Sequence, residues 1–158
     1  MLVAELPAPV LITRAEALKD LVKQLVQEPV VAVDTESNSL YAYREQVCLL
    51  QFSTPQVDYL VDPLALRDLS SLAGLFADPA ILKVFHAADY DILCLKRDFD
   101  FTFTNLFDTM VAARILGRPA VGLGGRSPDP SGSAEWRLDA AHPSAFSNVT
   151  NAAEYATM

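Results

Sequence analysis

The spacing of apolar residues along the chain switches several times between the helical period and the alternation typical of a strand. An apolar stripe at helical spacing, with Thr13 and Glu16 placed as a capping box, predicts a helix that ends before Pro29. Runs rich in β-branched and aromatic residues then cover 30–36, 46–54 and 56–62. These runs predict three successive strands of one sheet.

The second part of the pattern alternates helices with short strands. It predicts an amphipathic helix over 66–79, a buried strand over 80–87, a helix over 89–99, a short strand over 103–108 and a helix over 109–117. Asp108 is placed to begin the last helix and Gly117 to end it. The order of elements predicts an α/β fold, a mixed β-sheet flanked by helices.

The periodicity disappears from about Gly122. The stretch "GLGGRSPDPSGSAEWRLDAAHPSAFSNVTN" is rich in Gly, Pro and Ser and follows neither period. We therefore expect a domain core over 1–123 and an aberrant or disordered tail over 124–158. A linker, a disordered tail and sequence not selected for this fold are three open interpretations of the tail.

Composition narrows the class of protein. The chain has 158 residues, of which 51% are hydrophobic, which fits one globular domain. Its net charge of −8 disfavours a broad basic surface for polyphosphate, so binding of nucleic acid would require metal ions or a partner. Cys48 and Cys94 lie among apolar neighbours, which predicts buried, reduced thiols. We expect a soluble, cytoplasmic protein, because no signal-peptide pattern or membrane-spanning stretch is present.

Two acidic residues stand at the end of an apolar strand pattern. In "PVVAVDTESNSL", Asp34 and Glu36 are two residues apart, so a strand projects both carboxylates from one face. The negative charge of each carboxylate raises the pKa of the other. A hard divalent cation such as Mg²⁺, bound by the carboxylate oxygens, is the usual way to neutralise these charges. The alternative is a pair of ordinary solvated acids at an exposed strand end.

A second group of polar residues follows the strand over 80–87. The segment "KVFHAADYDILCLKRDF" places His86 after the strand and Asp89 and Asp91 in the first turn of a helix. The helix dipole favours acids there, which accounts for one of them more readily than for two. If the two strands are neighbours, their ends bring these residues towards Asp34. His86 is either a ligand-binding residue or a histidine satisfied by its local hydrogen bonds.

Four segments in order, "VAVDTESNSL", "VCLLQFST", "KVFHAADYDILCLKRDF" and "NLFDTMVAARILG", resemble the exonuclease domain of ribonuclease D and its exosome-associated relatives. This is the DEDD superfamily, in its tyrosine-containing (DEDDy) form, with a ribonuclease H-like fold. The resemblance runs from about Pro29 to Gly122. It implies a metal-dependent 3′-5′ exonuclease that processes RNA 3′ ends with two divalent ions, Mg²⁺ or Mn²⁺.

The resemblance also implies roles for individual residues. Asp34, Glu36 and Asp91 match three of the family's four metal-binding acids, and Tyr155 matches the tyrosine that orients the attacking water. Leu40, Tyr41, Tyr43 and His86 are then candidates for contacts with the terminal nucleotide; the alternative is that the loop residues are surface side chains that cover the edge of the sheet. We expect the three carboxylates to converge at one edge of the sheet.

The end of the chain departs from the family pattern. The family's fourth acid would follow Met158, and the stretch from about Gly125 to Tyr155 lacks the family's apolar helix, through either a frameshift or divergence. We therefore expect this chain to trim RNA very slowly or not at all.

Two classes of function stay open. One is a 3′-5′ exonuclease acting on single-stranded RNA 3′ ends, with DNA as an open alternative substrate and without an obligate protein partner. The other is a non-catalytic domain of the same fold that binds nucleic-acid ends or a protein. Metal affinity distinguishes the two classes.

Overall fold

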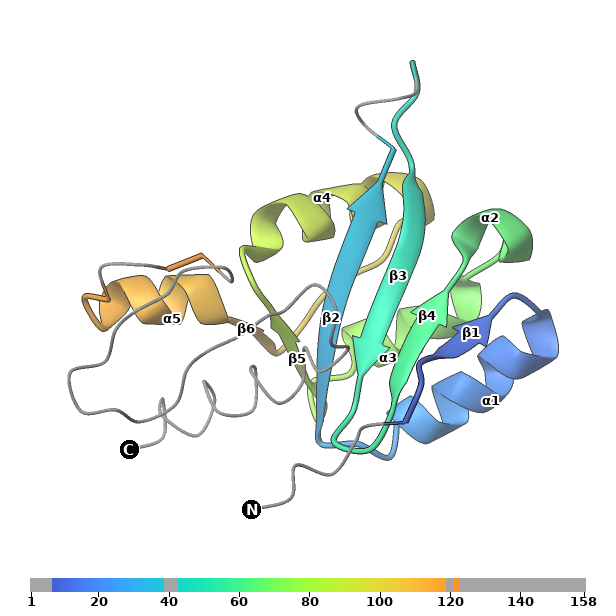
Figure 1. Ribbon diagram of the computed structural model, residues 1–158, viewed down its shortest axis with the longest axis horizontal. Coiled ribbons are helices and arrows are strands. Elements are labelled where there is room, and N and C mark those ends of the chain that lie inside the picture. The colour runs from blue at the N-terminus through green and yellow to red at the C-terminus, as the bar shows by residue number, and fades with distance from the viewer. Residues whose placement is uncertain (1–6, 39–42, 119–120, 123–158) are drawn as a thin grey trace.

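The computed structural model describes residues 7–38, 43–118 and 121–122, which form a six-stranded sheet and its helices (Figure 1). The strands are β1 (Val10–Ile12), β2 (Val30–Ser37), β3 (Val47–Ser53), β4 (Asp58–Val61), β5 (Leu82–Phe85) and β6 (Leu106–Asp108). The helices are α1 (Ala15–Leu25), α2 (Pro63–Leu66), α3 (Ala73–Ala77), α4 (Ala88–Phe99) and α5 (Thr109–Ile115), with a 3₁₀ turn, η1, at Ser70–Leu72. The predicted mixed α/β sheet is confirmed.

The strand order is β1-β4-β3-β2-β5-β6, so β2 and β3 occupy the centre of the sheet. β3 is antiparallel to both of its neighbours, whereas β2 is parallel to β5, β5 to β6 and β1 to β4. The strand carrying Asp34 and the strand before His86 are therefore neighbours, which is the condition under which their ends meet. Only residues 30–32 of β2 pair with β5, so the second half of β2 pairs with β3 alone.

The two faces of the sheet are covered differently. Val31 and Val33 of β2 belong to the main core, together with side chains from α1, α3 and α4. Ala32 belongs to a separate, small cluster with Val84. Because side chains alternate along a strand, Thr35 projects to the face of Val31 and Val33, and Asp34 and Glu36 project to the face of Ala32.

Two local predictions were wrong, and one strand was missed. Instead of one helix over 66–79 the structure has α2, which ends at Leu66, followed by η1 and α3, and β1 was not predicted. The capping box at Thr13 and Glu16 is not formed: Arg14 is the residue that begins α1, and it makes no side-chain cap. An arginine cannot accept a hydrogen bond from the first backbone N–H groups of a helix, so tertiary packing of the apolar stripe holds α1.

The two cysteines differ in burial. Cys94 is buried as predicted, Cys48 is only half-buried, and both thiols are free. Cys48 lies on β3 where the register with β2 shifts between Glu36 and Ser37, and this irregularity interrupts the regular alternation of faces that would bury it. Among the described residues, no helix combines the length and apolar character needed to span a membrane.

Candidate active site

Asp34 and Glu36 lie on β2 beyond Ala32, the last residue of this strand that pairs with β5. The strand extends one residue further than predicted, to Ser37, so both acids belong to its last four residues. Across the ladder Asp34 faces Gln51 of β3, whose Nε2 donates a hydrogen bond of 3.4 Å to Asp34 Oδ2. Both carboxylates are exposed on the face opposite the main core.

The environment of Asp34 raises its pKa above the ordinary value. Partial desolvation is the largest cause, although the residue is exposed, and the charge of Glu36 raises the pKa further. The backbone N–H group of Thr35 lowers it, with a smaller effect. Two carboxylates held side by side are an arrangement that a bound cation stabilises.

Asp91 lies in the first turn of α4 and is only 7% exposed. Its Oδ1 atom accepts a hydrogen bond from the Thr35 hydroxyl group. Burial is the largest cause that raises its pKa to about 6, and the charges of Asp34 and Glu36 add to the increase, whereas the Thr35 bonds lower it. Asp89, two residues earlier, is exposed, so Asp91 rather than Asp89 faces β2.

The structure thus brings the three acids to one edge of β2, close enough for each of the other two to influence the pKa of Asp91. It does not assemble them into one cluster: within 7–38, 43–118 and 121–122, no group of three or more potential ligands converges on a metal position. The reason lies in the pleat of β2. Asp91 is hydrogen-bonded to Thr35 on the helix-covered face, and Asp34 and Glu36 project to the other face.

His86 follows β5 directly and is half-buried. Its Nδ1 atom lies 2.8 Å from the Thr109 hydroxyl oxygen, and Thr109 Oγ1 lies 3.1 Å from the carbonyl oxygen of Phe85. Because the hydroxyl hydrogen is donated to that carbonyl, His86 Nδ1 is the donor and its Nε2 atom is left with a lone pair. Burial lowers the pKa of His86, which favours this neutral ring.

A network of charged side chains joins the β2–β3 hairpin to α4. Glu45 accepts hydrogen bonds from Ser37 Oγ at 3.0 Å and from Arg97 Nη1 at 2.8 Å. Asp98 accepts a hydrogen bond of 2.8 Å from the backbone N–H group of Val47. Sequence reasoning missed this network, because the bonds from Arg97 to Glu45 and from Val47 to Asp98 join residues 52 and 51 positions apart.

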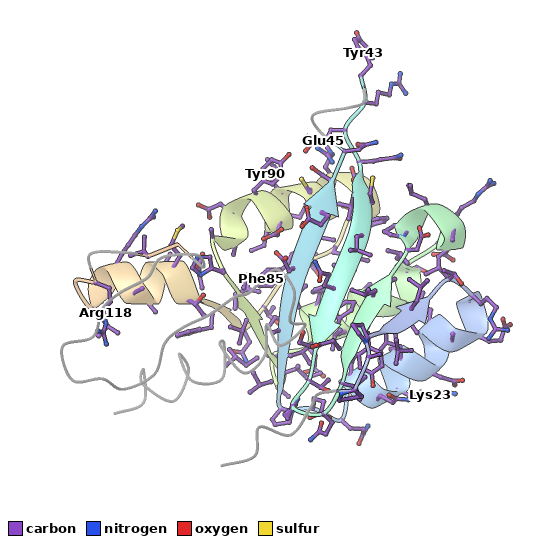
Figure 2. The ribbon with its side chains drawn as sticks, in the orientation of Figure 1. Lys23, Tyr43, Glu45, Phe85, Tyr90 and Arg118 are labelled. Carbon is purple, nitrogen blue, oxygen red and sulfur yellow. The ribbon has the colours of Figure 1, made fainter. Side chains whose placement is uncertain are left out.

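Two exposed tyrosines lie near the end of the sheet where β2 ends and β3 begins. Tyr90 of α4 is 48% exposed, and its hydroxyl group lies 3.5 Å from Ser37 Oγ at the end of β2. Tyr43, which leads into β3, is fully exposed. Figure 2 shows Tyr90 and Glu45 at the upper end of the sheet, with Tyr43 beyond them. The predicted substrate residues Leu40 and Tyr41 lie outside the described residues, as do Tyr155 and the tail over 124–158.

Comparison with known proteins shows the family to which the chain belongs. A family model described as 3′-5′ exonuclease matches residues 9–125. The Arabidopsis thaliana protein RRP6-like 3 is 47% identical over 103 residues, and the Saccharomyces cerevisiae exosome complex exonuclease RRP6 is 39% identical over 112 residues. These alignments cover 65% and 70% of this chain but only 12% and 15% of the relatives, so the chain spans a small part of their length.

Solved structures give the same result. The catalytic core of RRP6 from Trypanosoma brucei superposes with a TM-score of 0.72 at 31% identity, over 96% of this chain and 44% of that one. Escherichia coli RNase D, an exoribonuclease involved in structured RNA processing, superposes with a TM-score of 0.69 at 27% identity, over 94% and 41% of the two chains. The resemblance and the ribonuclease H-like fold expected from the sequence are thereby confirmed, and the chain belongs to the 3′-5′ exonuclease family.

Proposed function

We propose that this chain carries the catalytic carboxylates of a metal-dependent 3′-5′ exoribonuclease. The observation that carries the proposal is the placement of Asp34 and Glu36 on one face of β2, with Asp91 of α4 close enough for both charges to raise its pKa. A chain of this family with ordinary solvated acids at these positions would not bury one of them to 7% exposure.

The chemistry of the three side chains fits a divalent cation. Carboxylate oxygens are the ligands that Mg²⁺ and Mn²⁺ prefer, and the surplus of negative charge at β2 supplies the attraction. Asp34, Glu36 and Asp91 would hold the two ions that the family resemblance implies. Bound there, such ions supply charge neutralisation of the phosphate and activation of water.

The protein's own residues prepare this site. The exposed positions of Asp34 and Glu36 leave them open to a nucleotide, while Thr35 holds Asp91 from the buried side of the strand. His86 offers the lone pair of Nε2 as a hydrogen-bond acceptor. Tyr90 and Tyr43 offer aromatic rings at the same end of the sheet, suitable for stacking on unpaired bases.

The names of the relatives favour RNA as the substrate. RRP6 is named as an exosome exonuclease, and E. coli RNase D as an exoribonuclease involved in structured RNA processing. The net charge of −8 argues against extended contact with the nucleic-acid backbone, so we propose that the chain engages the 3′ end rather than a long tract. The free thiols support a reducing compartment such as the cytoplasm.

The test is a trimming assay under single-turnover conditions, with protein in excess over a 5′-labelled single-stranded RNA. We expect slow, stepwise shortening from the 3′ end in Mn²⁺, none with a chelator, and none with Asp34→Asn. An Asp62→Asn variant removes the same charge at the start of α2 and should trim like the wild-type protein. A DNA oligonucleotide of the same sequence measures the sugar preference. Shortening that Asp34→Asn retains would overturn the proposal.

A non-catalytic role is the alternative. It is favoured by one observation, the lack of a preassembled cluster of three ligands among the described residues. A chain of this kind would bind RNA 3′ ends or a protein without metal-dependent cleavage. Saturable RNA binding that is unaffected by both Mn²⁺ and Asp34→Asn, with no shortening in the assay above, would favour this alternative.

A further inference from the structure

The turn between β5 and α4 has a backbone conformation that its residues do not favour. Ala87 has φ of 59° and ψ of 52°, the left-handed region that glycine adopts without strain and alanine does not. This turn carries His86 and leads into the first turn of α4, where Asp91 lies. Other contacts must therefore hold the turn in place.

The main contact comes from Asp108, about twenty positions later in the chain. Its Oδ2 atom accepts a hydrogen bond of 2.8 Å from the N–H group of Ala88, and its Oδ1 atom accepts one of 3.1 Å from that of Ala87. Ala87 is the N-cap residue of α4, immediately before Ala88, and its side chain makes no capping hydrogen bond. Asp108 thus supplies the cap that α4 lacks.

The same carboxylate also begins α5. Asp108 Oδ1 accepts hydrogen bonds from the N–H groups of Met110 at 2.8 Å and Val111 at 3.1 Å. The sequence predicted this second role but gave no sign of the first. One side chain therefore joins the starts of two helices, and the position of α4 depends on a residue of the neighbouring strand β6.

Thr109 adds a second point of attachment to the turn. Its hydroxyl group donates to the carbonyl oxygen of Phe85 and accepts from His86 Nδ1. We define Asp108 and Thr109 as the clamp. Together they form hydrogen bonds with four consecutive residues, 85–88, so the strained Ala87 is held on both of its sides.

We propose that Asp108 is a positioning residue of the active site, which holds the left-handed turn at Ala87 and thereby places Asp91 against Thr35. This inference rests on the proposed function, since it assigns Asp108 a role through a metal-binding acid. Asp91 lies three residues after Ala88 in the same helical turn, so a change in the direction of that turn moves its carboxylate directly. The two carboxylate oxygens of Asp108 accept four hydrogen bonds from backbone N–H groups, so its role runs through the turn that it holds.

The test compares Mn²⁺ affinity among four variants of the full chain. Asp108→Ala removes all four bonds, and Asp108→Ala combined with Ala87→Gly removes them while relieving the strain. Ala87→Gly alone is the reference for that pair. Asp62→Ala is the matched control, because Asp62 caps a different helix, α2, by accepting bonds of 2.9 and 3.0 Å from the N–H groups of Leu64 and Ala65.

We expect Asp108→Ala to weaken Mn²⁺ binding about tenfold, as loss of a supporting residue typically does, and Asp62→Ala to change it less than twofold. Ala87→Gly should restore part of the loss in the double variant and change little alone. If Asp108→Ala does not fold, Asp108→Asn replaces it: an amide oxygen at the position of Oδ1 keeps three bonds and loses the bond to Ala88, for a smaller loss of affinity.

Two results would overturn the inference. One is equal Mn²⁺ affinity in the Asp108 and Asp62 variants of comparable thermal stability, and the other is a double variant no better than its Asp108 parent. Mn²⁺ binding by the wild-type protein distinguishes a failure of this inference from a failure of the proposed function. Wild-type protein without Mn²⁺ binding contradicts the function, whereas normal wild-type binding with either of these two results contradicts the role of Asp108 alone.

Discussion

The hydroxyl group of Thr35 donates a hydrogen bond to the carboxylate of Asp91, which joins the central strand β2 to the first turn of α4. Thr35 lies between Asp34 and Glu36, so one tripeptide carries two candidate ligands on one face and orients the third from the other. This contact leads to the first prediction.

Replacing Thr35 with valine should weaken Mn²⁺ binding and slow RNA trimming by roughly tenfold, because Asp91 loses the donor that orients it. Valine keeps the branched shape, so packing on the helix-covered face is preserved. Thr35→Ser keeps the hydroxyl group and should stay within about threefold of the wild-type protein. Isothermal titration with Mn²⁺ measures the effect; a serine variant as weak as the valine variant would show that packing, not the hydrogen bond, matters.

The second prediction concerns pH and Asp108. Burial alone would raise the pKa of Asp108, but four backbone N–H groups lower it below the ordinary value of 3.8. A group whose pKa is lowered in the folded state stabilises the protein above its unfolded pKa and loses that contribution as pH falls through the folded value. The free energy of unfolding of wild-type protein should therefore exceed that of Asp108→Asn at neutral pH.

That difference should shrink as the pH falls below about 4 and approaches the lowered pKa at which the Asp108 carboxylate becomes protonated in the folded protein. Urea unfolding of both proteins at several pH values measures it. A difference that stays constant down to about pH 2 would show that the carboxylate charge contributes nothing at this position.

The third prediction concerns the network around Glu45. Arg97→Ala removes its bond of 2.8 Å to Glu45 and its contacts with Asp98, and should cost on the order of 1 kcal/mol, since the arginine is partly exposed. Lys23→Ala is the control, because it removes an ion pair of the same length, 2.8 Å, between two exposed side chains. Urea unfolding should give the control less than half the effect. Equal losses would mean that the hairpin is not held to α4 by this network.

The local pattern of the sequence was enough to predict the parts of the fold that depend on periodicity. Continuous runs of apolar, strand-forming residues located β2 and β5, and Asp108 and Gly117 correctly bounded α5. β1 was missed because it is a three-residue edge strand whose first two residues are exposed, which leaves no alternation to detect. The helix over 66–79 was interrupted by the left-handed Arg67, a conformation that the apolar stripe did not indicate.

The sequence singles out the three candidate acids but not the contacts that support them. Strand spacing pairs Asp34 with Glu36, the family resemblance selects Asp91, and in the structure the charges of the first two raise the pKa of Asp91. The bonds from Thr35 to Asp91 and from Ala87 and Ala88 to Asp108 join residues that are distant in sequence. A single sequence carries no signal for such pairs, because local propensity describes only neighbours along the chain.

The most direct test of the central claim, that Asp34, Glu36 and Asp91 form a divalent-cation site, is a Mn²⁺ titration followed by the electron paramagnetic resonance signal of the free ion. We expect saturable binding by the wild-type protein, loss of that binding in Asp34→Asn, and wild-type binding in Asp62→Asn, which removes the same charge elsewhere. Equal binding by wild-type protein and Asp34→Asn, or no saturable binding by the wild-type protein, would contradict the claim.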